Sequence, residues 1–189
     1  LYDYLATGRV SGLLVIKQGS IAFEKYFLGN DENTRWMSMS VVKSITAMLV
    51  GAAIKDGHID SIDDQVTKYL PQLIGSAYEG VTVKHLLQMA SGVKWNETYT
   101  DVSSDRRAML EAQISQQPGA ILALMASLPR VAEPGTRYNY STGETQVVGA
   151  LVAAVTGTTV SDYLSQKIWA KAGMELSLIH ISEPTRQEA

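Results

Sequence analysis

The sequence contains no cysteine, only three histidines and no strong excess of one charge. Without cysteine there are no disulfides and no thiol nucleophile. The histidines, His58, His85 and His180, lie far apart in the sequence, so a Cys/His metal site is not expected. A formal net charge of −3 provides no basic stripe for nucleic acid. Glycine-rich phosphate loops are absent too, and we therefore expect no metal, no other cofactor and no nucleic-acid partner.

Long hydrophobic runs and a recognisable signal segment are also absent. The longest apolar stretch, around residues 45–54, is interrupted by Thr46 and Gly51 and is too short to cross a bilayer. No charged and then apolar segment precedes Leu1. We expect a protein without a membrane span, and the lack of cysteine does not by itself fix the compartment.

The two ends of the sequence do not look like natural termini. The chain begins with Leu1 rather than Met, which is typical of a sequence that starts within a gene. The string LSLIHISEPTR, at 176–186, resembles the translation of a sequencing-library adapter and continues no pattern before it. We expect residues 1–175 to form the N-terminal and middle part of one domain, and 176–189 to be a non-native tail. His180 is therefore left out of every catalytic hypothesis.

The N-terminal region predicts a β-hairpin. Runs rich in β-branched and other apolar residues occupy 10–17 and 21–28, and Gly19 between them can adopt the positive φ that a tight turn needs. A lone hairpin is marginal in water, so partner strands are required. Those strands are missing or very weakly signalled in the remaining sequence.

Every other strong pattern is helical. Residues 40–56 carry apolar side chains at the 3.6-residue period, with Ser40 suited to the N-cap and Gly57 to the position after the C-cap. Ser161 is the expected cap of the last helix. The other predicted helices are 83–90, 105–114, 120–128, 144–155 and 162–172.

The pattern Ser-x-x-Lys occurs twice, at Ser40–Lys43 and at Ser91–Lys94. Because the chain has 17 Ser and 9 Lys, chance supplies roughly 0.8 matches, so the pattern alone proves nothing. Ser40 begins a strongly periodic helix, where positions i and i+3 share a face and the lysine amine can reach the hydroxyl. A helix N-terminus also favours a developing oxyanion. Ser91 is followed by Gly92, where a helix ends, and we interpret the second match as coincidence.

Three blocks in the sequence resemble β-lactamase-related serine hydrolases. Ser40 and Lys43 lie in the first block, and the third holds Tyr140-Ser141-Thr142. The blocks are RWMSMSVVKSIT at 35–46, HLLQMASG at 85–92 and PGTRYNYSTGE at 134–144. They are most similar to the branch of the family that contains 6-aminohexanoate-dimer hydrolases and carboxylesterase-like proteins.

The resemblance assigns roles to five residues. It implies that Ser40 is the nucleophile, Lys43 its charged neighbour and Tyr140 the phenol that relays protons. Tyr138 is a rival for Tyr140, since the motif could be shifted by two positions. Thr142 stands where class C β-lactamases have asparagine, and a hydroxyl lacks the fixed donor and acceptor pair of an amide. This difference weakens the case for true β-lactamase activity but keeps Thr142 as a substrate-binding candidate.

The polar loop 96–105 is a second candidate substrate region. Tyr99 and Asp101 lie where this branch of the family places substrate contacts, and we take Tyr99 as substrate-binding. A loop that is merely solvated explains the same residues equally well.

The implied fold is α+β. It is a β-lactamase/transpeptidase-like α/β sandwich with a helical subdomain, here truncated before the C-terminal strands. The third motif of the family, Lys-Thr-Gly or His-x-Gly, does not occur, and it normally lies beyond the length of this chain. We therefore expect the chain on its own to be inactive.

The implied function is a serine hydrolase that forms an acyl-enzyme with a small ester, amide or peptide-like substrate. The alternatives are a slowly acylating penicillin-type receptor, a non-catalytic binding module and an inactive fragment. A Ser-His-Asp hydrolase is disfavoured because no G-x-S-x-G motif occurs. The resemblance favours an exported or periplasmic protein, and it leaves the oligomeric state and the scissile bond open.

Overall fold

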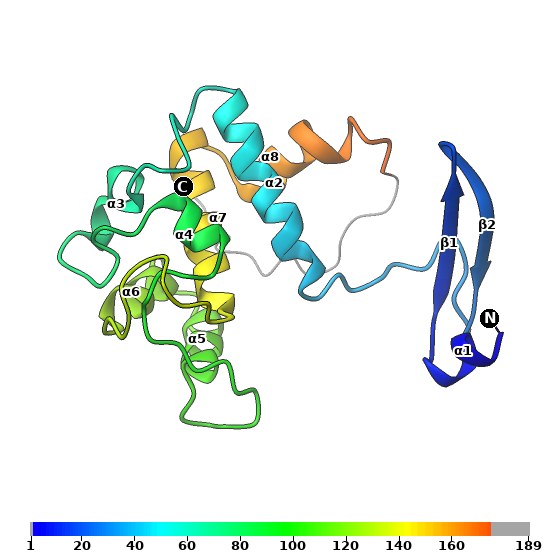
Figure 1. The fold of residues 1–189 in the computed structure, drawn as a ribbon, viewed down its shortest axis with the longest axis horizontal. Coiled ribbons are helices and arrows are strands. Elements are labelled where there is room, and N and C mark those ends of the chain that lie inside the picture. Colours follow the sequence, from blue (N-terminus) through cyan, green and yellow to red (C-terminus); the bar gives the residue numbers. More distant parts are fainter. Residues whose placement is uncertain (1, 175–189) are drawn as a thin grey trace. The chain divides into compact units, whose positions relative to one another are not determined.

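The computed structural model describes residues 2–174, which divide into two compact units. The first unit contains residues 2–37 and the second contains residues 38–174 (Figure 1). Each unit has its own secondary structure, and the two are described separately. Ser40, Lys43 and Tyr140 all belong to the second unit.

The first unit is a short helix followed by the predicted hairpin. Helix α1 spans Tyr2–Thr7, and β1 (Gly12–Lys17) pairs antiparallel with β2 (Ser20–Tyr26). The two turn residues, Gln18 and Gly19, have φ of 52° and 78°, the pattern of a type I′ turn that suits the twist of paired strands. The predicted hairpin is therefore confirmed. Helix α1 was not predicted.

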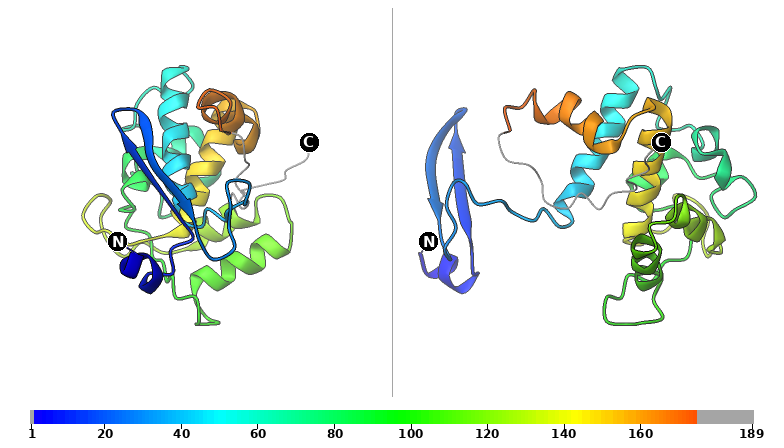
Figure 2. Two further views of the ribbon diagram at one scale, coloured as in Figure 1. Left: turned by 90° about the vertical axis from the view of Figure 1, so that its right-hand side faces the viewer. Right: turned by 180° about the vertical axis from the view of Figure 1, so that it is seen from behind.

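The second unit is helical. Helix α7 lies at its centre, packed against α2, α4 and α6, as Figures 1 and 2 show. Around α7 the chain forms α2 (Val41–Lys55), α3 (Val66–Tyr69), the 3₁₀ turn η1 (Pro71–Leu73), α4 (Val83–Leu87), α5 (Asp105–Ile114), α6 (Ala120–Ser127), α7 (Thr142–Thr156), α8 (Val160–Leu164) and the π-helical η2 (Ser165–Trp169).

Helix α7 is buried over its first three turns, and its residues 147–155 are all apolar or glycine. Leu151 and Val152 are fully buried against the core, as are Leu49 and Ala53 of α2. Gly143 lets neighbouring side chains approach closely, since a Cβ there would meet Met125 at 2.5 Å. A buried central helix fixes both of its ends, and the site depends on its N-terminal end.

Two predicted helices start elsewhere in the structure. The helix predicted at 144–155 begins at Thr142, because the Ser141 hydroxyl accepts the Glu144 amide at 3.1 Å and so caps it earlier. The helix predicted at 162–172 begins at 160, and its cap is Thr159 rather than Ser161. In both cases the serine or threonine three residues before the bonded amide decides the start.

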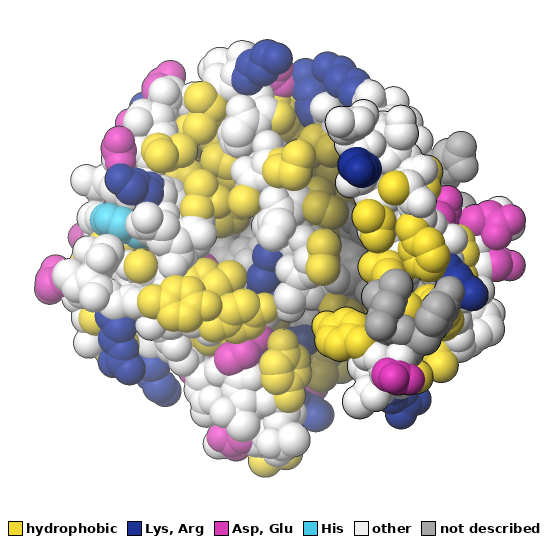
Figure 3. Space-filling model, turned by 45° about the vertical axis from the view of Figure 1, so that its right-hand side comes forward, with side chains coloured by type: hydrophobic (Ala, Val, Ile, Leu, Met, Phe, Trp, Pro, Cys, Tyr) yellow, Lys and Arg dark blue, Asp and Glu magenta, His cyan; other side chains and the backbone are white. Residues whose placement is uncertain are grey.

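Several large apolar side chains are exposed, and Figure 3 shows hydrophobic side chains spread over one face. They include Leu14, Ile16 and Ile21 of the hairpin and Val41 and Met48 of α2. Within residues 2–174 no single helix is long and apolar enough to cross a membrane. Helix α7 and residues 160–169 meet at a bend of 79°. Together they are long and apolar enough to cross a membrane, by length and composition alone.

Candidate active site

Three side chains from distant parts of the sequence meet at the start of α2. The Tyr140 hydroxyl donates to Ser40 Oγ at 2.7 Å, and the Lys43 ammonium donates to the same oxygen at 3.2 Å. Lys43 Nζ also lies 5.3 Å from the centre of the Tyr140 ring. The structure thus brings two of the predicted catalytic side chains, Lys43 and Tyr140, within hydrogen-bonding distance of the third, Ser40.

The turn before α2 aims the Ser40 side chain outward. Met39 has φ of +47°, a conformation that is uncommon and strained for a residue with a side chain. Ser40 occupies the N-cap position, but its hydroxyl makes no capping bond, contrary to the cap expected from the sequence. The amides of Val41 and Val42 are already bonded to the carbonyls of Ser38 and Met39. These two amides therefore do not supply the free oxyanion donors expected at this helix start.

The segment that carries Tyr140 is fixed by backbone and side-chain bonds. The Asn139 amide donates to the Met89 carbonyl at 2.8 Å, and its side-chain amide donates to the Trp95 carbonyl at 3.0 Å. Tyr138 is exposed and lines a cavity beside Lys43, whereas Tyr140 is half-buried and reaches Ser40. The geometry therefore favours Tyr140 over its rival.

The start of α2 is open to solvent. Ser40 is exposed, and Lys43 is half-buried. A cavity of about 240 Å³ opens beside Lys43, between α2 and α7. The apolar side chains on either side of Ser40, Met39 and Val41, are exposed.

Glu97 joins the two predicted substrate-binding residues. Its carboxylate accepts the Thr142 amide at 2.9 Å, the Thr142 hydroxyl, the Tyr99 hydroxyl at 2.9 Å and the Trp95 indole N–H. Thr142 is buried, and the Tyr99 ring is exposed. Burial and the bond to Glu97 raise the pKa of Tyr99. Glu97 was not predicted, because nothing in the polar loop 96–105 marked one acidic residue above another.

The family model described as Beta-lactamase matches residues 3–188. The chain belongs to the beta-lactamase family. The 6-aminohexanoate-dimer hydrolase of Paenarthrobacter ureafaciens is 32% identical to it over 163 residues, which cover 84% of this chain and 41% of that protein. This membership confirms the resemblance inferred from the three sequence blocks.

Solved structures of the beta-lactamase family share the fold. The octameric penicillin-binding protein homologue from Pyrococcus abyssi matches with a TM-score of 0.73 and 24% identity, over 92% of this chain and 42% of that one. A class C beta lactamase matches with a TM-score of 0.70 and 19% identity, over 92% and 47%. The predicted α+β, β-lactamase/transpeptidase-like fold is therefore confirmed, and the chain spans less than half the length of these relatives.

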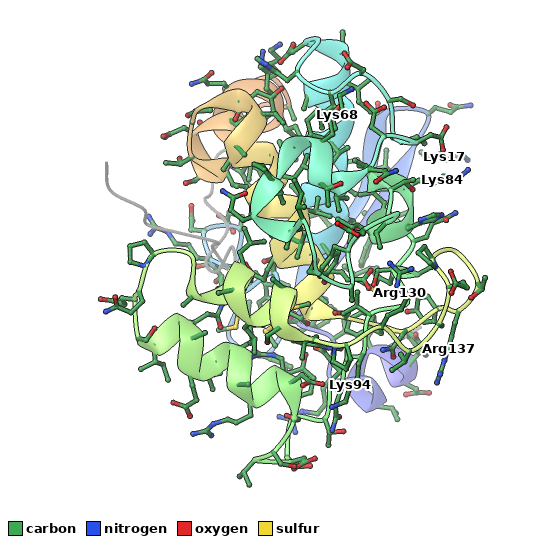
Figure 4. All side chains as sticks on the ribbon, turned by 90° about the vertical axis from the view of Figure 1, so that its left-hand side faces the viewer. Lys17, Lys68, Lys84, Lys94, Arg130 and Arg137 are labelled. Atoms are coloured by element: carbon green, nitrogen blue, oxygen red, sulfur yellow. The ribbon has the colours of Figure 1, made fainter. Side chains whose placement is uncertain are left out.

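The second Ser-x-x-Lys match has a different geometry from that of the first. Ser91 is fully buried, donates its hydroxyl to Glu144 and accepts the Val93 amide at 3.0 Å. Lys94 is exposed at the surface, where Figure 4 labels it, and it makes no bond to Ser91 among the described residues. Ser91 therefore supports the core instead of meeting a lysine.

Glu144, in the first turn of α7, carries a buried carboxyl group. Burial raises its pKa to about 7, although the bond from Ser91 acts in the opposite direction. One of its oxygens is buried without a hydrogen-bond partner within residues 2–174, and so is the hydroxyl of Tyr78. Burial, with the nearby Glu144 charge, also raises the pKa of Tyr78. Tyr78 carried no signal in the sequence, and Glu144 was marked only as the end of the third block and the predicted start of a helix.

A second acidic residue of the loop, Asp101, shapes the backbone. Asp101 accepts the Ser103 amide at 2.8 Å, the Ser103 hydroxyl at 2.7 Å and the Asn96 side chain at 3.3 Å. These bonds lower the pKa of Asp101. Across residues 2–174 no group of three His, Cys, Asp or Glu side chains is arranged to hold a metal ion.

Proposed function

We propose that the protein carrying this chain is a serine hydrolase that forms an acyl-enzyme at Ser40. The observation that supports it most directly is that Ser40 Oγ accepts hydrogen bonds from both Tyr140 and Lys43. A serine alcohol becomes a good nucleophile only when a neighbouring base removes its proton. Membership of the beta-lactamase family supports hydrolytic chemistry in general.

In the proposed acylation, Ser40 Oγ attacks the carbonyl carbon of the substrate. The Ser40 proton passes to the Tyr140 oxygen, 2.7 Å away; the step requires Tyr140 to have given up its own proton first, so that the hydrogen bond then runs from Ser40 to the phenolate. The Lys43 ammonium, on one side of the phenol ring, stabilises that phenolate. Tyr140 then returns the proton to the leaving alcohol or amine as the tetrahedral intermediate collapses to acyl-Ser40.

In the proposed deacylation, water takes the place of the leaving group. Tyr140 removes a proton from the water as its oxygen attacks the acyl carbon, and the acid product forms as the proton returns to Ser40 Oγ. The same residue thus acts as base in one step and acid in the next, in line with microscopic reversibility. The other basic group bonded to Ser40 Oγ among the described residues is Lys43, and as an ammonium it has no acceptor position.

We propose a linear ester or amide as the substrate class, in preference to a β-lactam. The named activity of the Paenarthrobacter relative, which hydrolyses a 6-aminohexanoate dimer, supports a linear amide. Thr142 argues against β-lactam specificity, because its hydroxyl is buried and donated to Glu97. No amide side chain is available at that position to bind a β-lactam.

A mass-spectrometric trapping experiment tests the proposal. The protein is mixed with a p-nitrophenyl ester, quenched within milliseconds and digested, and the acyl group is expected on the peptide that contains Ser40. A linear diamide and a β-lactam follow in the same assay, with the diamide expected to turn over faster. An adduct on another residue would refute the mechanism, and an adduct that persists for hours would favour a slowly acylating receptor.

A further inference from the structure

The carboxylate of Glu97 connects the polar loop to the start of α7. One oxygen accepts the hydroxyls of Tyr99 and Thr142, and the other accepts the Trp95 indole and the Thr142 amide. An ionised carboxylate has about four acceptor positions, so all of them are in use. Glu97 therefore has no free acceptor position for a substrate and is well suited to hold other groups in place.

The place where Glu97 acts is two residues from Tyr140. Thr142 is the first residue of α7, and its amide is one of the N–H groups that a helix start leaves without an intrahelical partner. A negative charge at the start of this 15-residue helix is favoured by the helix dipole. Glu97 thus both satisfies the amide and anchors the helix start to the loop.

Tyr140 lies between two anchors that bind the same stretch of chain. On one side Asn139 is bonded to the carbonyls of Met89 and Trp95. On the other side Thr142 is bonded to Glu97. Since both anchors lead to residues 89–97, the 139–142 segment is held at each end, and the long phenol side chain extends from it to Ser40. A small rotation of the segment would move the hydroxyl away from Ser40 Oγ.

We propose that Glu97 is a positioning residue that holds Tyr140 on Ser40 through the N-terminus of α7. The inference rests on the proposed function, since it assigns Glu97 to the geometry of that reaction and not to its chemistry. A displacement of about 1 Å at a reacting group costs on the order of 10²-fold in rate. Losing the Glu97 anchor should therefore lower kcat much more than it raises KM.

Two substitutions separate hydrogen bonding from charge. In Glu97→Gln the amide oxygen can still accept the Trp95 indole and the Thr142 amide, and the NH₂ group can donate to the two hydroxyls, which rotate. Glu97→Leu has a similar size and keeps none of the four bonds. We expect Glu97→Leu to lower kcat for a p-nitrophenyl ester about 10²-fold. Glu97→Gln should stay within a few-fold of the unmutated protein.

Asp105→Ala is the matched control for loss of stability. Asp105 accepts the Asn96 amide at 2.8 Å, so its removal loosens the same loop without touching α7. We expect Asp105→Ala to lower the melting temperature while kcat changes only a few-fold. If Asp105→Ala lowers kcat as far as Glu97→Leu does, loop stability explains the effect and the proposal is wrong.

A double-mutant cycle with Tyr140→Phe tests whether Glu97 acts through Tyr140. If it does, Glu97→Leu should cost little further activity once the phenol hydroxyl is gone. An equal further loss in that background, or a Glu97→Gln variant as impaired as Glu97→Leu, would overturn the inference. Crystal structures of the two Glu97 variants test the geometry independently of turnover: Tyr140 should leave Ser40 only in Glu97→Leu. If the unmutated protein shows no acylation of Ser40, the proposed function is refuted. The crystal structures of the Glu97 variants still test whether Glu97 positions Tyr140.

Discussion

The two Ser-x-x-Lys sequences of this chain lie in opposite kinds of surroundings. Lys43 follows Ser40 by three residues at the start of α2, and its ammonium reaches the Ser40 hydroxyl at 3.2 Å. Lys94 follows Ser91 by the same spacing, but Gly92 between them has φ of +77° and the chain leaves the helical path. Ser91 is buried and donates its hydroxyl to Glu144, whereas Lys94 is exposed.

The difference teaches that the spacing works only through the backbone that carries it. A helical backbone puts positions i and i+3 on one face, and a glycine with positive φ sends the second side chain elsewhere. Gly92 is also required by packing, because a Cβ there would lie 2.0 Å from the Ala132 carbonyl oxygen. The same four-residue pattern therefore predicts a nucleophile at one position and a structural hydroxyl at the other.

The largest expected effect separates the two serines by activity. Ser40→Ala should abolish turnover of a p-nitrophenyl ester, because it removes the proposed nucleophile. Ser91→Ala should leave kcat within a few-fold under conditions where the protein stays folded, because Ser91 does not contact Ser40, Lys43 or Tyr140. Initial rates of the two variants side by side provide the measurement. Comparable losses in both would remove the distinction between the two sites.

The next effect separates the two lysines. Lys43→Met keeps the length of the side chain but removes the charge beside Tyr140, and we expect kcat to fall on the order of 10²-fold. Lys94→Met should change kcat by less than about 2-fold, since Lys94 is a surface side chain. The ester assay with enzyme concentration set by active-site titration measures both. A fully active Lys43→Met variant would contradict the role given to Lys43.

A third effect reverses the order of the two serines, because it concerns stability. Ser91→Ala leaves the buried Glu144 without its donor and the Val93 amide without its acceptor, and should cost about 1–3 kcal/mol of unfolding free energy. Ser40→Ala removes an exposed hydroxyl that caps nothing, and should change stability by less than about 0.5 kcal/mol. Urea unfolding of both variants decides the matter. A larger loss of unfolding free energy in Ser40→Ala than in Ser91→Ala would contradict the assignment of Ser91 to the core and of Ser40 to the exposed site.

Local sequence signals predicted the local structure well. The hairpin followed from β-rich runs around Gly19, and helix α5 has the bounds that its sequence predicted, 105–114. Besides the unpredicted helix α1, the errors concern helix starts, at Thr142 and Val160, where a serine or threonine earlier than expected provides the cap. Those choices depend on which of several neighbouring hydroxyls meets an amide, and periodicity does not resolve that.

Contacts between distant residues could not be read from the sequence. Tyr140 meets Ser40 across 100 residues, and only the resemblance to a family indicated the pair. Glu97 and Thr142 are 45 residues apart, and Ser91 and Glu144 are 53 apart. Neither acidic residue stands out in composition or spacing, because what distinguishes them is burial and the donors that surround each carboxylate.

The last expected effect extends the comparison to pH. Burial raises the pKa of Glu144 to about 7 from an ordinary value of 4.5. Between these two values the folded protein keeps a proton that the unfolded chain has lost, so the unfolding free energy falls as pH rises through this window, by at most about 1.4 kcal/mol per pH unit. Glu144→Gln should remove this slope, and Ser91→Ala should extend it to higher pH because the Ser91 bond lowers the pKa of Glu144. Urea unfolding from about pH 5 to pH 8 measures the slopes. Parallel curves for Glu144→Gln and the unmutated protein would show that Glu144 does not titrate in this range.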